Sequence, residues 1–166
     1  ISDKRNAVED LFKAKIARED VDMKFDKFCR IIDRIKSTLS IKPINETRYK
    51  QRNDFYTLFC FIDKHISDSI ELFELQYRIL AFISESGLIS PSNESYNLFK
   101  EYAINCVSQS NSKKAREARL LFFEELLANR NECINNTQGQ LIRYIEVERK
   151  NRINISKIDG YLMINI

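Results

Sequence analysis

Residues 53–66 read NDFYTLFCFIDKHI, and this stretch decides the fold. Seven of the eight residues from Phe55 to Ile62 are apolar, so a helix here would be apolar on nearly its whole circumference. The aromatic content would also suit a strand. However, the segment begins at a candidate helix cap, Thr47, and runs too long for an ordinary strand. The sequence therefore predicts a central helix over residues 47–66 that other elements surround.

Composition supports a helical domain around this segment. The chain has 166 residues, of which 43% are hydrophobic and 31% charged, an ordinary balance for a single globular domain. It contains only three Gly and two Pro, which indicates long helices and short loops. We expect a mainly α fold: a single helical domain of six or seven helices over residues 1–150, followed by a small C-terminal β-hairpin over residues 151–166.

Apolar spacing places the other elements. Helices are predicted over residues 2–18, 20–39, 67–87, 91–107, 113–130 and 141–147. The Asn-rich residues 129–140 read as a connector or a frayed helix. From Arg152 the apolar period changes from 3.6 to 2, and Asp159-Gly160 is typical of the turn between two hairpin strands. The first residue is Ile rather than Met, so we expect a piece of a longer protein whose sheet continues beyond the cut.

The cysteine spacing indicates a cellular compartment, and the net charge bears on which partners to expect. Cys29, Cys60, Cys106 and Cys133 are widely spaced and form no CxxC pair, which favours buried free thiols in a reducing compartment. No apolar run approaches the length of a membrane span, so we expect a cytoplasmic protein with no membrane partner. The formal net charge of +3 comes from 27 basic and 24 acidic residues, a balance that does not by itself imply nucleic acid.

The sequence offers no catalytic or metal-binding constellation. Asp22 and Asp26 would share a helix face as two metal ligands could, but no His or further oxygen ligand is near, and acids here stabilise a helix start. His65, the only histidine, falls in the last turn of the central helix, where a structural role is favoured. A Gly-rich phosphate loop and a nucleophile motif are missing. We expect no metal, no cofactor and no enzyme activity of this fragment alone.

Two segments resemble a known family. The run Asn53-Asp54-Phe55-Tyr56-Thr57-Leu58-Phe59 is similar to helices in the C-terminal helical part of GmrSD-type modification-dependent restriction proteins. The small polar stretch from Ser108 to Ser112, followed by Arg116 and Arg119, also resembles that region. The resemblance implies that an N-terminal ParB/sulfiredoxin-like domain in the longer protein carries the nucleotide and DNA chemistry of a nuclease or NTPase. No catalytic residue can be carried over to this chain.

The candidate nucleic-acid contacts lie at the start of one predicted helix. Lys113, Lys114, Arg116 and Arg119 bring positive charge to a helix N-terminus, where a phosphate would offset the unfavourable dipole. Arg119 could instead be a structural arginine. The helix start could also contact only solvent, with Glu117 as the local partner of its basic residues.

These observations lead to two functional expectations. The first is a non-catalytic accessory module of a DNA-directed, anti-phage restriction protein, with DNA and the rest of the parent chain as partners. The alternative is a protein-protein interaction scaffold with no nucleic-acid role.

Overall fold

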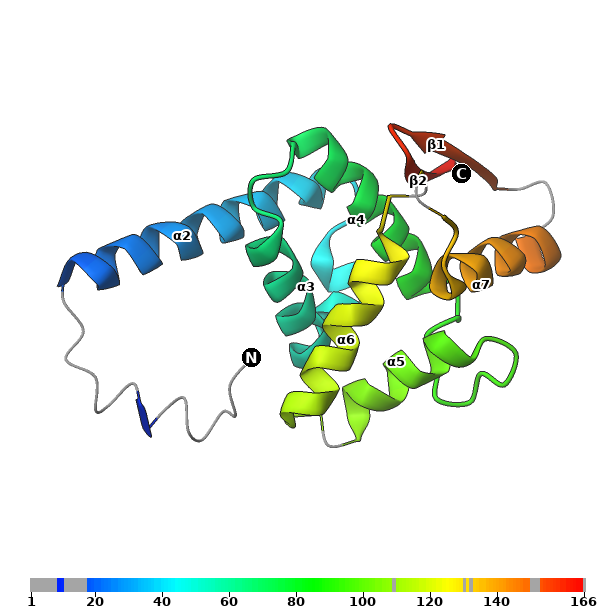
Figure 1. Ribbon diagram of the computed structural model, residues 1–166, viewed down its shortest axis with the longest axis horizontal. Helices are drawn as coiled ribbons and strands as arrows, with labels where there is room; N and C mark the ends of the chain where they lie inside the picture. Colours follow the sequence, from blue (N-terminus) through cyan, green and yellow to red (C-terminus); the bar gives the residue numbers. More distant parts are fainter. Residues whose placement is uncertain are drawn as a thin grey trace.

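The protein is mainly α-helical. The computed structural model describes residues 9–10, 18–108, 110–129, 131, 133–149 and 153–165. Within them, six helices precede one antiparallel hairpin (Figure 1): α2 (Arg18–Ser37), α3 (Arg52–Lys64), α4 (Ile70–Glu85), α5 (Asn97–Val107), α6 (Lys113–Leu126), α7 (Asn136–Tyr144), β1 (Asn154–Ile158) and β2 (Tyr161–Asn165). This order confirms the predicted fold class. The helix expected over residues 2–18 falls largely outside the described residues.

The central helix is shorter than predicted, because Thr47 caps a different element. Its side chain accepts a hydrogen bond from the Tyr49 backbone N–H and heads a separate 3₁₀ turn, Arg48–Lys50. A hydroxyl that bonds the backbone two residues on competes with a helix start. Tyr49 is fully buried, and its hydroxyl donates to the Leu80 carbonyl at 2.9 Å, which fixes the turn on α4. As a result α3 begins only at Arg52.

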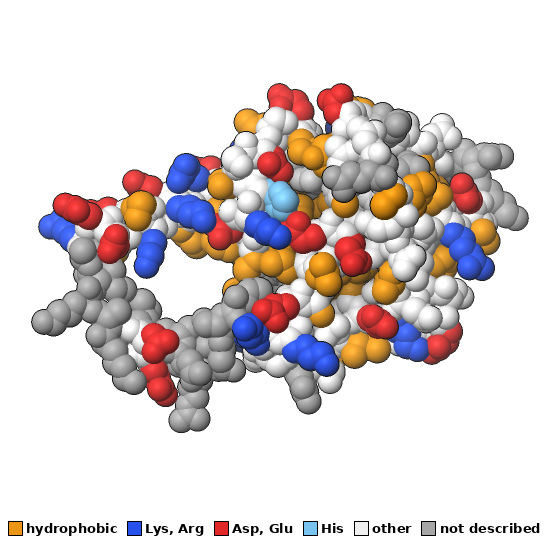
Figure 2. All heavy atoms as spheres, viewed as in Figure 1, with side chains coloured by type: hydrophobic (Ala, Val, Ile, Leu, Met, Phe, Trp, Pro, Cys, Tyr) orange, Lys and Arg blue, Asp and Glu red, His pale blue; other side chains and the backbone are white. Residues whose placement is uncertain are grey.

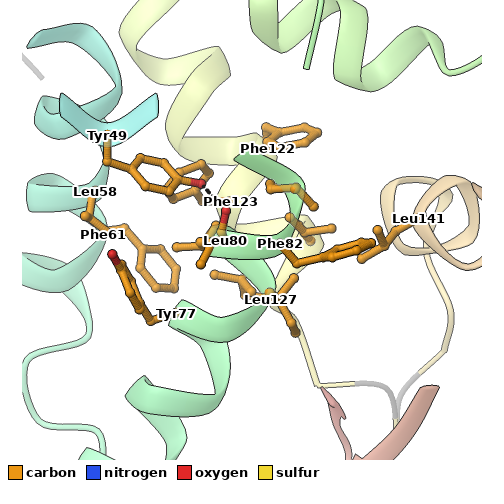
Figure 3. Close-up of a cluster of buried hydrophobic side chains, with 14 of the residues drawn as sticks. Tyr49, Leu58, Phe61, Tyr77, Leu80, Phe82, Phe122, Phe123, Leu127 and Leu141 are labelled. Atoms are coloured by element: carbon orange, nitrogen blue, oxygen red, sulfur yellow. Dashed lines mark hydrogen bonds between the residues drawn. The ribbon is translucent and has the colours of Figure 1, made fainter. Parts of the chain in front are cut away.

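The core lies between α3, α4 and α6. Tyr49, Leu58, Phe61, Tyr77 and Phe123 converge there (Figure 3). The helix α4 has eight buried residues against five for α3, so the two helices share the centre. Tyr56 of α3 remains 42% exposed, so α3 is not covered all round.

Aromatic contacts attach α5 to this core, and a capping box starts α7. The Tyr102 ring stacks on Phe123 with 5.6 Å between centroids. Asn135 accepts from the Gln138 backbone N–H, and the Gln138 side chain accepts from the Asn135 N–H, so α7 begins at Asn136. Residues 136–140, for which a connector or a frayed helix was predicted, are therefore helical, and the last helix begins before the predicted Leu141. A π-helical turn, Ile145–Arg149, continues α7.

The C-terminal hairpin has the predicted turn. Asp159 and Gly160 adopt positive φ values of 47° and 84°, as a two-residue turn that matches strand twist requires. Ile158 pairs with Tyr161 at the turn. Leu162 and Ile164 are buried in the same core as the helices, so the hairpin packs on the helical domain beside α4 (Figure 1).

All four cysteines are free thiols, as predicted, but they are not all buried. Cys106 is buried, Cys29 and Cys60 are half-buried, and Cys133 is exposed. The expectation of four buried thiols was wrong for Cys133 because it lies before α7 rather than on an inward helix face. Among the described helices, none combines the length and the apolar character needed to cross a lipid bilayer.

Candidate interaction surface

The four predicted phosphate contacts do not share one surface. Lys113 and Lys114 are exposed in the first turn of α6, where Ser112 caps the helix by accepting from the Ala115 N–H at 3.1 Å. Arg116 and Arg119 are only 8% and 1% exposed. The structure therefore leaves the two lysines accessible to a ligand and turns the two arginines inward.

Arg119 joins three parts of the chain. Its Nε donates to Thr57 Oγ1 on α3 at 3.0 Å, and its Nη1 donates to the carbonyls of Asn105 and Ser110 at 2.5 and 3.1 Å. Arg116 donates to the Asn111 carbonyl in the same loop. A guanidinium that already serves buried acceptors would have to give them up to reach a phosphate. This arrangement favours the structural alternative for Arg119.

A second buried polar group surrounds Asp54, which is fully buried near the start of α3. Arg48 Nε donates to Asp54 Oδ1 at 2.7 Å, the Tyr102 hydroxyl donates to the same oxygen at 2.9 Å, and the Cys106 thiol lies 3.6 Å from it. Arg48 also donates to the Ile89 carbonyl at 3.0 Å. Sequence reasoning missed this network. Its one signal was an acid directly preceding the apolar run of α3, because a buried carboxylate needs a partner.

Burial sets the chemistry of this network. Burial lowers the pKa of Arg48, but the hydrogen bond and the charge of Asp54 outweigh it, so the net pKa is raised. Burial and the Asp54 charge raise the pKa of Tyr102 well above its usual value, and they raise the pKa of Cys106 to about 12. A thiol with such a pKa is not a nucleophile at neutral pH. The network therefore ties Arg48, α3 and α5 together.

His65 lies at the C-terminal end of α3 between two carboxylates. Its Nδ1 is 3.2 Å from Asp68 Oδ2, its Nε2 is 2.9 Å from Glu124 Oε2, and its ring lies 4.6 Å from the Phe61 ring. These contacts join α3, the start of α4 and α6, as the predicted structural role requires. Within the described part of the chain, no group of three or more His, Cys, Asp or Glu residues could hold a metal ion.

Four of the exposed large apolar side chains among the described residues lie on α2. Figure 1 shows the N-terminal part of this helix extending away from the other helices, and Figure 2 shows hydrophobic side chains among the charged ones along it. Val21, Phe25 and Phe28 are 49%, 63% and 48% exposed, and we call these three residues the α2 face. One to two turns later, Ile31 and Ile35 are buried in the core. Phe28 marks the transition, with its ring 5.7 Å from Phe59 of α3.

The apolar spacing of the sequence predicted this stripe on α2, but not its exposure.

Comparisons of the chain with protein-family models, with curated proteins and with solved structures find no match. The functional argument therefore rests on the geometry of the α2 face, the exposed lysines of α6 and the surfaces around them.

Proposed function

We propose that this domain is a non-catalytic helical interaction module that pairs with a second copy of the chain through the α2 face. The observation that carries the proposal is the exposure of Val21, Phe25 and Phe28 on a helix that extends from the folded body. Soluble domains scatter single apolar residues over their surface, but a row of them on one helix is typical of an interaction site.

The spacing of the row fits helix pairing. Val21, Phe25, Phe28, Ile32 and Ile35 alternate steps of four and three residues, the pattern of a helix that packs along another helix. The core covers Ile35, whereas the first three positions have no comparable cover. The α2 face thus continues an existing packing stripe beyond the body.

A two-fold arrangement would bring the α2 faces of two copies together. In an antiparallel pair, Phe25 would lie near Phe25 of the second copy, and the two bodies would sit at opposite ends. The three side chains of each copy are about half exposed, so their burial would contribute roughly 5 to 9 kcal/mol. Because association costs at least about 4 kcal/mol, the net gain is at most about 5 kcal/mol, so we expect a weak dimer that forms only at about 0.1 mM or above.

Sedimentation velocity over a concentration series tests this proposal. Phe25→Asp should abolish the concentration-dependent rise in mass. Met23→Asp is a matched control, because Met23 is 62% exposed against 63% for Phe25 and lies about 200° round the same helix from Val21. A monomer at every concentration, or equal loss in both variants, would contradict pairing through the α2 face.

A second candidate function is contact with a nucleic-acid backbone, as in a DNA-directed defence protein of the GmrSD type. The exposure of Lys113 and Lys114 beside the N-terminus of α6 favours it, because both can reach a phosphate without breaking a buried contact. Lys113 Nζ lies 3.9 Å from Glu117 Oε1, a weak ion pair that would compete with a phosphate for this lysine. Under this proposal the module positions DNA for chemistry performed elsewhere in the parent protein.

Electrophoretic binding to duplex DNA across a salt series tests this second function. Removing two phosphate contacts with Lys113→Ala/Lys114→Ala should lower the slope of log affinity against log salt by about 2. Lys24→Ala/Lys50→Ala removes the same charge from exposed positions elsewhere and should leave the slope unchanged. If wild-type protein does not bind duplex DNA at low salt, or if both double variants lose the same slope, the contact is refuted.

A further inference from the structure

The surface between α4 and the hairpin is hollowed into a cleft of about 430 Å³. Its apolar lining comes from both elements: Leu72 and Leu75 on the first turns of α4, and Ile158, Tyr161 and Met163 on the hairpin. A hollow of this size with apolar walls is in the range that binds ligand groups. The cleft shares no residue with the α2 face.

Both walls of the cleft are held by the fold. On one side, Ser69 caps α4 by accepting from the Leu72 N–H at 3.1 Å. On the other, Leu162 and Ile164 anchor β2 in the core, and Asn129 Nδ2 donates to the Asp159 carbonyl at 3.1 Å. A cleft whose walls are already fixed loses little conformational entropy when a ligand enters.

The charged groups at the cleft are mostly acidic. Three carboxylates, Glu71, Glu74 and Asp159, and one guanidinium, Arg78, give a formal charge of −3 + 1 = −2. None of these four side chains forms an ion pair with another described residue. Their unpaired negative charge therefore favours a cationic ligand.

The cleft follows α4 and adjoins a second hollow. Its α4 wall spans Glu71 to Arg78, about 10 Å of helix. Arg78 also lines a second hollow of about 280 Å³, farther along α4 beside Phe82, Glu85 and Ile164. The two hollows together follow α4 and β2, which suits a peptide segment better than a compact small molecule.

We propose that the cleft between α4 and the hairpin binds a basic amphipathic segment of a partner protein. Apolar side chains of the segment enter between Leu72, Leu75 and Met163, and its Lys or Arg side chains pair with Glu71 and Glu74. This binding is independent of the α2 face, so a monomeric domain binds the segment equally well.

The test uses a fluorescent peptide of leucine and lysine, about three helical turns long, titrated against the whole chain by anisotropy. A matched peptide with glutamate in place of lysine is the first control, and it should not bind. Glu71→Gln/Glu74→Gln should weaken the lysine peptide about three- to tenfold, because two exposed ion pairs are lost. Asp22→Asn/Asp26→Asn removes two carboxylates from α2 instead and should leave the affinity unchanged.

Leu75→Gln probes the apolar wall and should weaken the same peptide, provided that thermal melting shows the variant to be folded. Absence of lysine-peptide binding would overturn the proposal. So would equal binding of both peptides, or equal weakening by the two double variants. Neither the glutamate peptide nor the Asp22→Asn/Asp26→Asn variant replaces a residue of the α2 face. These results therefore do not depend on whether two copies pair through it.

Discussion

Asp54 and Arg119 carry buried charges near the start of α3, and their hydrogen bonds join α3 to the neighbouring elements. Asp54 receives hydrogen bonds from Arg48 and Tyr102, and one turn later Thr57 receives one from Arg119. A buried charge costs several kcal/mol when its partners are lost, so these residues are positions where substitution should strongly affect stability.

Arg119→Ala tests this structural role. The change leaves Thr57 Oγ1 and the carbonyls of Asn105 and Ser110 without this donor, so we expect a loss of about 3 to 5 kcal/mol in the free energy of unfolding. Urea denaturation measures it. Lys114→Ala, on the exposed side of the same helix, should change the value by less than about 0.5 kcal/mol. If the two variants had similar urea midpoints, the structural role would be contradicted and Arg119 would again be a candidate for phosphate contact.

The Cys106 thiol makes stability depend on alkaline pH. Its pKa is raised to about 12 by burial and by the Asp54 charge, from the value of 9.0 that an unfolded thiol has. Between these values the folded state keeps a proton that the unfolded chain releases, so rising pH favours unfolding by about 1.4 kcal/mol per pH unit.

Urea midpoints measured from pH 8 to pH 10 check this dependence. Stability should be constant up to about pH 9 and then fall. Cys106→Ala should make the fall between pH 9 and pH 10 shallower, although burial also raises the pKa of Cys60, Tyr49 and Tyr102, and these groups leave a residual slope. An unchanged slope in the variant would show that the Cys106 thiol stays protonated equally well in both states.

At the scale of the elements, the turn of the hairpin depends on Gly160. Its φ of +84° disfavours any other residue, and an added Cβ would come within 2.0 Å of Asn129 Oδ1. Gly87 has a similar φ of +80° but open space around it. Gly139 lies inside α7 with open space and no unusual φ.

Three alanine variants separate strain from crowding. Gly87→Ala should cost about 1 kcal/mol from backbone strain, and Gly160→Ala should cost more because crowding adds to the same strain. Gly139→Ala should stabilise the protein by about 0.5 to 1 kcal/mol, because alanine is the better helix former. Thermal melting of the three variants gives the order, and equal costs at Gly87 and Gly160 would rule out the crowding by Asn129.

The elements differ in how well the sequence predicted them. Long periodic stretches and the Asp159-Gly160 turn set α2, α4 and the hairpin correctly, because their signals are local. Thr47 was misplaced because its hydroxyl bonds Tyr49 in a separate turn, which contacts with distant residues such as Leu80 and Ile89 stabilise. The start of α7 was not located although Asn135 and Gln138 have capping-box spacing, since the Asn-rich composition suggested a connector or a frayed helix.

At the scale of the whole molecule, periodicity identifies an apolar face but not what covers it. The stripe on α2 runs from Val21 to Ile35 without a change in pattern, yet only its second half meets the core. The burial of Arg119 depends in the same way on Asn105 and Ser110, which lie in other parts of the fold. The sequence could therefore predict candidate surfaces, whereas their accessibility required the packing of all the helices.

Thiol labelling reports this packing across the molecule. Cys133 is exposed and should react first with a thiol reagent, while the half-buried Cys29 and Cys60 should react more slowly. Cys106 is 5% exposed and has a pKa of about 12, so it should react only after α3 and α5 separate in global unfolding. Mass spectrometry of time points without denaturant should show this order, and moderate urea should accelerate Cys106 far more than Cys133. Labelling of Cys106 as fast as Cys60 in native buffer would mean that α5 opens locally, without the rest of the core.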